Sequence, residues 1–164
     1  MNLNQNINII YRNYHQIDIE KTIKEMNLFC KKNNRKLFIS NYLKIALKYD
    51  LDGFYLPSFN TELKYKNINK KKKFKIIGSA HNIKEIKIKE KQGCEEIFIS
   101  PIFYNSKNKK YLDVIKFNIL NLYTKRKTIA LGGIASQNIS KLKCTKVSGF
   151  ASISWIKKNG LRNS

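Results

Sequence analysis

The chain has 164 residues, which fits a single domain, and its hydrophobic content of 42% with 12% aromatic residues is enough for a packed core. These values exclude two full domains and an intrinsically disordered chain. The 33 Lys and Arg residues exceed the 11 Asp and Glu residues, giving a net charge of +22. This charge has two interpretations, a bias of the whole composition toward lysine or an anionic partner.

Short β-branched runs alternate with longer amphipathic stretches along the chain, a pattern typical of parallel βα units. We expect strands over 7–12, 36–39, 53–56, 74–78, 97–100, 128–131 and 149–153. We expect helices over 18–33, 42–49, 82–92, 111–123 and 139–142. Asp18 and Asn82 are the predicted N-caps, and Gly93 is the predicted C-terminal stop of the third helix. Because the strands are continuously apolar, both faces of the sheet should be covered, as in a barrel or a doubly wound sheet.

The three cysteines, Cys30, Cys94 and Cys144, lie far apart and form no C-x-x-C pair. Neither a disulfide framework nor a zinc site is therefore favoured, and we expect each cysteine to be a small core residue. The first ten residues carry no charged leader, and no stretch approaches the roughly 18 apolar residues of a membrane span. We expect a soluble, cytoplasmic protein without membrane contact.

In parallel βα folds, ligands bind where the strands end. The residues just after the predicted strands are Ser, Asn, Arg, Lys, Gly and other neutral or basic types, without Asp or Glu, so the predicted site suits an anion. Gly132 and Gly133 would let backbone N–H groups approach a phosphate, although a tight turn also explains the pair. His15 and His81 lie in the same loops, as solvent-facing histidines or as groups that contact a ligand.

Four blocks stand out along the chain: IIGSAHN (76–82), IFISPIFYNSKNKK (97–110), IALGGIASQN (129–138) and GFASISWI (149–156). In order and spacing they resemble the matching blocks of thiamine phosphate synthase and its TenI-type relatives. The stretches NIIYRNYH, KLFISNYLKIAL and LDGFYLPSFN are similar to the family's second, third and fourth strand blocks. The resemblance implies an α/β fold, a TIM-barrel-like (β/α)8 domain over 1–164. The family's first strand and helix have no counterpart before Ile7, which leaves seven strands.

The resemblance also implies a transferase of thiamine biosynthesis that joins a pyrimidine diphosphate to a thiazole phosphate and releases pyrophosphate. The resemblance implies catalytic roles for Arg12 and Ser79, which match family positions, and for Lys107, a cation near the family's Thr-x-Thr-Lys run, which reads Asn-Ser-Lys-Asn over 105–108 here. The implied substrate-binding residues are Arg12, Ser40, Asn41, Ser79, Asn105, Lys107, Lys109, Gly132, Gly133 and Ser154. Mg²⁺ holds the diphosphate in the family, at two aspartates that correspond to Asn41 and Asn60 here, and neutral amides should weaken that metal site.

These departures leave alternatives open. The chain is either an active synthase or a non-catalytic relic of the family that binds a phosphorylated ligand or regulates. A third hypothesis, less favoured, is nucleic-acid binding through the charge run Lys70–Lys73. The expected partners are the phosphorylated thiazole and pyrimidine, and a homo-oligomer is compatible with each alternative.

Overall fold

The computed structural model describes residues 7–15, 18–65, 68, 73–106, 110–153 and 155. Within these residues seven strands form one sheet, in which every paired neighbour is parallel and the spatial order follows the chain order. The strands are β1 (Ile9–Tyr11), β2 (Leu37–Ser40), β3 (Gly53–Leu56), β4 (Lys75–Ala80), β5 (Glu96–Ile99), β6 (Lys127–Leu131) and β7 (Gly149–Ala151). The helices are α1 (Ile19–Lys32), α2 (Leu43–Lys48), α3 (Ile83–Lys91), α4 (Asp113–Asn121) and the 3-10 helix η1 (Ile139–Cys144).

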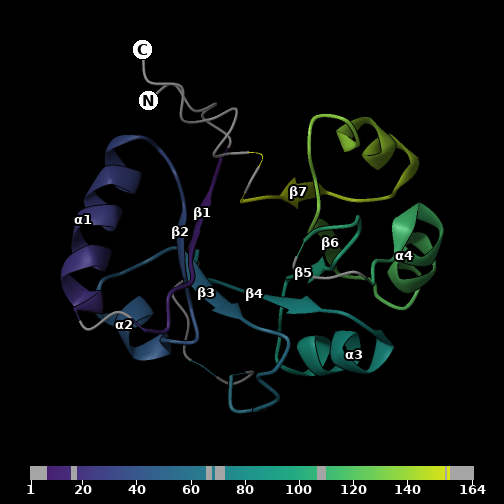
Figure 1. The fold of residues 1–164 in the computed structure, drawn as a ribbon. Helices are drawn as coiled ribbons and strands as arrows, with labels where there is room; N and C mark the ends of the chain where they lie inside the picture. Colours follow the sequence, from purple (N-terminus) through teal and green to yellow (C-terminus); the bar gives the residue numbers. More distant parts are fainter. Residues whose placement is uncertain are drawn as a thin grey trace.

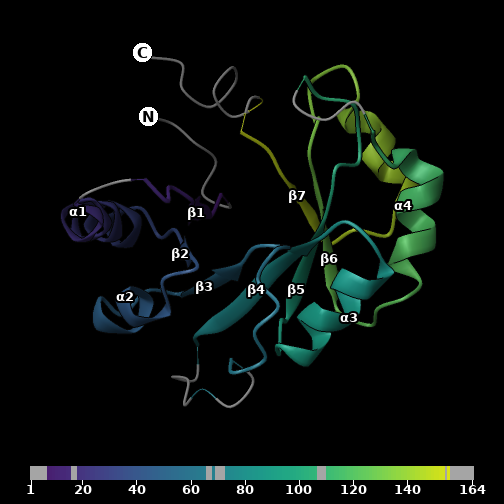
Figure 2. The same cartoon turned by 60° about the horizontal axis from the view of Figure 1, so that its bottom comes forward.

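The sheet curls, and α1 to α4 lie along its outer side (Figures 1 and 2). This confirms the predicted α/β class and its TIM-barrel-like arrangement of seven strands. Among the described residues β1 and β7 each pair with one neighbouring strand, so the sheet is a curled half-barrel rather than a closed cylinder. In part of the connection between β3 and β4, residues 57–65, the chain forms no helix.

Both faces of the sheet are apolar, as the continuous hydrophobic runs predict. Alternate strand residues such as Ile39 and Phe54 point outward into a core shared with Ile23 of α1 and Phe117 of α4. The residues of opposite parity form a second cluster on the inner face, built on Phe38, Tyr55, Ile77 and Phe98. Tyr55 and Phe98 meet edge to face, with ring centroids 5.7 Å apart.

The predicted helix caps are confirmed. The Asp18 carboxylate accepts the backbone N–H of Lys21 at 3.1 Å, at the start of α1. Asn82 does the same for Glu85 at 2.9 Å, and the Glu85 carboxylate in turn accepts the backbone N–H of His81 at 2.7 Å. These bonds satisfy donors that a helix leaves unpaired at its N-terminus. Gly93 follows α3 with a positive φ of 81°, as a helix-terminating glycine should.

One prediction about burial is wrong, and the helix predicted over 111–123 buries little of its apolar surface. Ile115 of α4 is 76% exposed and Leu122, just after the helix, is 80% exposed, whereas Phe117 is fully buried. Spacing located this helix but not its buried face, because apolar residues occur on both sides of it. Cys30 and Cys94 are buried as expected, but Cys144 is exposed at the end of η1.

Most boundaries also differ slightly from the prediction; β4, for example, continues through Ser79 to Ala80 instead of ending at Gly78. The last strand ends at Ala151 instead of residue 153, because the Ser152 hydroxyl donates to the carbonyl of Ile134 at 3.2 Å and ties the chain to the loop after β6. The short segment after β6 is a 3-10 helix and continues to Cys144. In the part of the chain that the structure describes, no helix is both long and apolar enough to cross a membrane.

Candidate anion-binding site

The ends of β1 and β2 are joined by a hydrogen-bonded chain of polar side chains. Arg12 follows β1 and donates from Nε to the Tyr14 hydroxyl at 3.1 Å. That hydroxyl lies 2.8 Å from Oγ of Ser40, the last residue of β2. The Arg12 guanidinium is exposed and lies 5.7 Å from the centre of the Tyr14 ring. Tyr14 therefore holds the stem of Arg12 while the charged end of the side chain stays open to an anion.

Asn41 and Asn60 form a direct amide pair between the ends of β2 and β3. Asn60 donates from Nδ2 to Oδ1 of Asn41 at 2.7 Å and to the Tyr65 hydroxyl at 3.1 Å. Its own Oδ1 accepts the backbone N–H of Glu62 at 3.0 Å. Asn60 is buried, whereas Asn41 is exposed and has a positive φ of 66°. Asparagine is among the few residue types that adopt such a backbone readily.

A fully buried lysine lies beneath this amide pair. Lys89 of α3 donates from Nζ to the carbonyls of Pro57 and Asn60 at 2.8 and 2.7 Å, and to Oε1 of Gln92 at 2.9 Å. Three acceptors satisfy the three N–H groups of an ammonium. Burial lowers the pKa of Lys89 to about 8, because a charge without water around it is disfavoured. Gly78 of β4 makes room for the lysine stem, since a Cβ there would lie 2.8 Å from Cδ of Lys89.

Ser79 and Tyr55 lie further inside the mouth of the half-barrel. Both are buried, on the adjacent strands β4 and β3. Burial raises the pKa of Tyr55, and its hydrogen bond with Ser79 opposes that shift. His81 follows β4, and its Nδ1 lies 2.7 Å from the carbonyl of Ser100. His81 is exposed, and its Nδ1 is hydrogen-bonded to the neighbouring loop.

The loops after β5 and β6 pack closely on one another. The N–H of Phe103 donates to the carbonyl of Gly132 at 3.1 Å, and that of Ile102 to the carbonyl of Leu131 at 2.9 Å. Gly132 and Gly133 have positive φ values of 94° and 71°. A Cβ on Gly133 would collide with the carbonyl oxygens of Phe103 and Tyr104. Only glycine fits this approach of two backbones.

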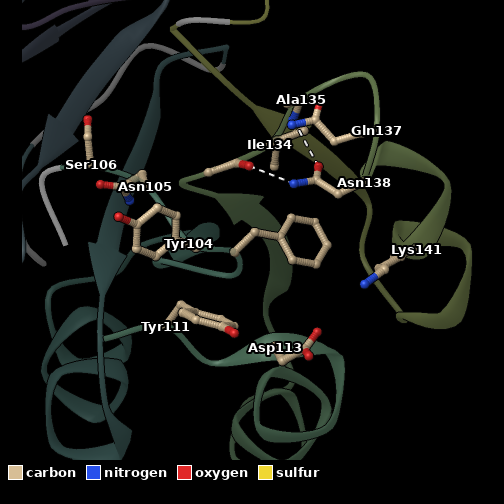
Figure 3. A pocket seen from close by; sticks show the side chains of 12 residues that line it. Tyr104, Asn105, Ser106, Tyr111, Asp113, Ile134, Ala135, Gln137, Asn138 and Lys141 are labelled. Atoms are coloured by element: carbon tan, nitrogen blue, oxygen red, sulfur yellow. Dashed lines mark hydrogen bonds between the residues drawn. The ribbon is translucent and has the colours of Figure 1, made fainter. Parts of the chain in front are cut away.

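A cavity of about 430 Å³ opens between these two loops (Figure 3). Its walls include Tyr104 and Asn105 after β5, Tyr111 before α4, Gly133 after β6 and Lys141 of η1. Asn138 clamps the β6 loop, because Nδ2 donates to the carbonyl of Gly133 and Oδ1 accepts the N–H of Ala135, both at 2.8 Å (Figure 3). The Asp113 carboxylate and the Lys141 ammonium both line the cavity, so its walls carry one charge of each sign among polar and aromatic side chains (Figure 3).

The structure divides the predicted site residues into two groups. The β1–β3 side holds two hydrogen-bonded sets. Tyr14 links Arg12 to Ser40, and Asn41 pairs directly with Asn60. Asn105 and Gly133 line the cavity on the β5–β6 side, next to Gly132. Ser79 lies on β4, between these two sides. Lys107, Lys109 and Ser154 lie outside the described residues, as does most of the run Lys70–Lys73.

Comparison with known proteins assigns the chain to a family. The sequence model of a family described as thiamine monophosphate synthase matches residues 7–156, nearly the whole chain. The chain belongs to this family. A thiamine-phosphate synthase of Prochlorococcus marinus subsp. pastoris is 37% identical over 144 residues, which cover 85% of this chain and 39% of that protein. One from Clostridium novyi is 30% identical over 154 residues, covering 90% of this chain and 74% of that protein.

The fold agrees with a solved structure of the family. Thiamine phosphate pyrophosphorylase from Pyrococcus furiosus superposes with a TM-score of 0.74 at 21% identity, over 90% of this chain and 72% of that one. Because the chain spans only 39% of the length of the Prochlorococcus relative, the activity of the whole relative does not transfer automatically to this chain.

Family membership implies Mg²⁺, and the donor set at Asn41 and Asn60 does not fit that ion. Mg²⁺ is bound through oxygen atoms, mostly carboxylates and phosphates. Here the Asn41 side-chain oxygen accepts an N–H from Asn60, and the Asn60 oxygen accepts N–H groups from Glu62 and Gln92. Within the described ranges, no group of three or more His, Cys, Asp or Glu residues could hold a metal ion.

Sequence reasoning missed Lys89, Gln92 and Tyr65, which support the amide pair from below. Lys89 carried a signal: it stands three residues after Ile86, on the buried face of α3. A lysine on an apolar helix face indicates either a snorkelling side chain or a buried charge with dedicated acceptors. The acceptors are loop carbonyls of Pro57 and Asn60, which periodicity does not place.

Proposed function

We propose that this chain joins a pyrimidine diphosphate to a thiazole phosphate, forming thiamine phosphate and releasing pyrophosphate. Membership of the family over residues 7–156 supports this proposal. The single observation that carries it is the arrangement of the two polar regions. A cationic, donor-rich region at β1–β3 and a glycine loop with a cavity at β5–β6 lie at the ends of one parallel sheet. Two anionic substrates would approach each other across that edge.

In this reaction the carbon–oxygen bond between the pyrimidine methylene and the diphosphate breaks, and its electron pair leaves on pyrophosphate. The thiazole nitrogen then forms the new bond to the same carbon. Negative charge grows on the leaving group as its bond breaks, so a cation fixed beside it stabilises the transition state. Arg12 is that cation in our proposal, with Tyr14 and Ser40 fixing its direction.

The second substrate would lie toward the β5–β6 side. Gly133 and Lys141 line the cavity on that side, where Lys141 supplies a positive charge beside the carboxylate of Asp113. Ser79, beside Tyr55, would orient the pyrimidine between the two regions. Holding both substrates along one line converts a reaction between two molecules into a step within one complex.

The test is formation of thiamine phosphate by the purified protein from the two substrates, compared with the Arg12→Ala and Arg126→Ala variants. Arg126 is an exposed arginine before β6 and serves as the charge-matched control. Loss of the leaving-group cation should lower kcat by about 10²-fold or more, whereas Arg126→Ala should leave the rate unchanged. Equal rates in the two variants would refute the role of Arg12.

A binding or regulatory protein of the same family is the second candidate, favoured by the loss of both metal carboxylates at Asn41 and Asn60. It predicts no product under any condition, but saturable binding of thiamine phosphate or thiazole phosphate by calorimetry. Competition by thiamine phosphate at constant salt would also separate this candidate from non-specific binding of nucleic acid.

A further inference from the structure

We propose that the β1–β3 region binds a diphosphate directly through N–H donors, without a divalent metal ion. The inference rests on the proposed function for the choice of a diphosphate as the anion. At this place the family uses oxygen atoms to hold a cation, whereas this chain turns N–H groups toward the ligand.

The orientation of the two amides is determined by a backbone group. The N–H of Glu62 only donates, so the Asn60 atom that it contacts at 3.0 Å is the carbonyl oxygen. The other end of that amide is therefore the NH₂ group, which lies 2.7 Å from Asn41. Because an NH₂ group only donates, the Asn41 atom that faces it is the oxygen. The Asn41 NH₂ group thus points away from Asn60.

The Asn41 NH₂ group is therefore available to a ligand. Asn41 is exposed, and within the described part of the chain its Nδ2 has no hydrogen-bond partner. Arg12 lies on the neighbouring strand end and uses only Nε internally, so its terminal N–H groups are also available. An arginine fork and an amide NH₂ match the several acceptor oxygens of a diphosphate.

The buried Lys89 reinforces the same polarity. Its ammonium donates to the carbonyls of Pro57 and Asn60 and to Oε1 of Gln92, and Nε2 of Gln92 in turn donates to the Asn60 carbonyl at 3.0 Å. This network holds the loop that carries Asn60 and thereby the direction of Asn41. A fixed positive charge under the loop also disfavours a second cation and favours an anion above it.

The experiment measures binding of inorganic pyrophosphate by isothermal titration calorimetry, in EDTA and again with excess Mg²⁺. The key variant is Asn41→Asp, which keeps the shape and tolerates a positive φ but replaces the NH₂ group with a charged oxygen. Asn34→Asp is the matched control, because Asn34 is also an exposed asparagine with a positive φ, of 52°, at the end of α1.

We expect the unaltered protein to bind pyrophosphate in EDTA, and Mg²⁺ not to strengthen that binding. Asn41→Asp should weaken binding in EDTA by at least about tenfold, because a donor becomes a like charge. Asn34→Asp should bind as the unaltered protein does. Binding that requires Mg²⁺, or Asn41→Asp binding as tightly as Asn34→Asp in EDTA, would overturn the inference.

The two proposals fail in different ways. If pyrophosphate binds in EDTA through Asn41 but no thiamine phosphate forms, the metal-free binding is supported and the proposed synthase activity is refuted. If thiamine phosphate forms but pyrophosphate binding requires Mg²⁺, the synthase activity is supported and the metal-free binding is refuted.

Discussion

Replacing Gly133 with alanine should destabilise the fold strongly, because two independent penalties meet at this residue. Its φ of 71° is in the left-handed region, which costs an L-residue about 1–2 kcal/mol. The new Cβ would also lie 2.5 Å from the carbonyl carbon of Phe103 and closer still to two carbonyl oxygens. Such overpacking typically costs about 1–3 kcal/mol. We therefore expect the free energy of unfolding to fall by about 2–5 kcal/mol.

Urea denaturation measures this loss, and Gly149→Ala is the matched control. Gly149 lies in β7, where an added Cβ would meet only the Ile129 Cδ1 atom at an ordinary 3.6 Å. The same chemical change should therefore alter the free energy of unfolding by about 1 kcal/mol or less there. If Gly133→Ala proved as stable as Gly149→Ala, the close packing of the β5 and β6 loops would be refuted, and with it the described wall of the cavity.

Two further predictions concern the clamp of the β6 loop and the buried lysine. Asn138→Ala removes both 2.8 Å bonds of the clamp and should cost about 1–3 kcal/mol in urea denaturation, so a change near zero would contradict the clamp. The pKa of Lys89 is lowered to about 8, against about 10.4 for an unfolded lysine, so the unfolded chain binds more protons between those two pH values. The free energy of unfolding should therefore increase as pH rises from about 8 to about 10.4. Lys89→Met should abolish this increase, whereas replacement of the exposed Lys91 in Lys91→Met should retain it. Identical pH dependence of unfolding in the two variants would show that Lys89 keeps an ordinary pKa.

The fold was largely predictable because its strongest signals are local. Period and turn residues placed every strand within a few residues, and the Asp18 and Asn82 caps were visible as side chains before amphipathic runs. The buried face of α4 was not predictable, since Ile115 and Phe117 are both apolar and only tertiary packing chooses between them. The prediction that Cys144 is buried was wrong for a related reason, because a short 3-10 helix has too few residues for periodicity to indicate which of them are buried.

The candidate site was predictable in its location but only partly in its chemistry. Position at strand ends identified Arg12, Asn41 and Gly133, because parallel strands deliver their following residues to one edge. The orientation of the Asn41 amide could not be predicted from the sequence. It depends on the backbone N–H of Glu62, more than twenty residues later in the chain, in a loop without periodicity.

Asn41 and Asn60, which stand where the family has aspartates, form one hydrogen-bonded network and are best considered together. An aspartate at position 60 would bring its carboxylate within hydrogen-bonding reach of the Tyr65 hydroxyl and of the Asn41 oxygen, both now served by an NH₂ group. The Asn41 oxygen would then face a carboxylate oxygen, a second acceptor, instead of a donor, and their hydrogen bond would be lost. The asparagine at 60, the asparagine at 41 and the ammonium beneath them therefore depend on one another. Because an unpaired buried cation is costly, the three acceptors of Lys89 must be arranged together, and two of them are carbonyls of the loop that carries Asn60.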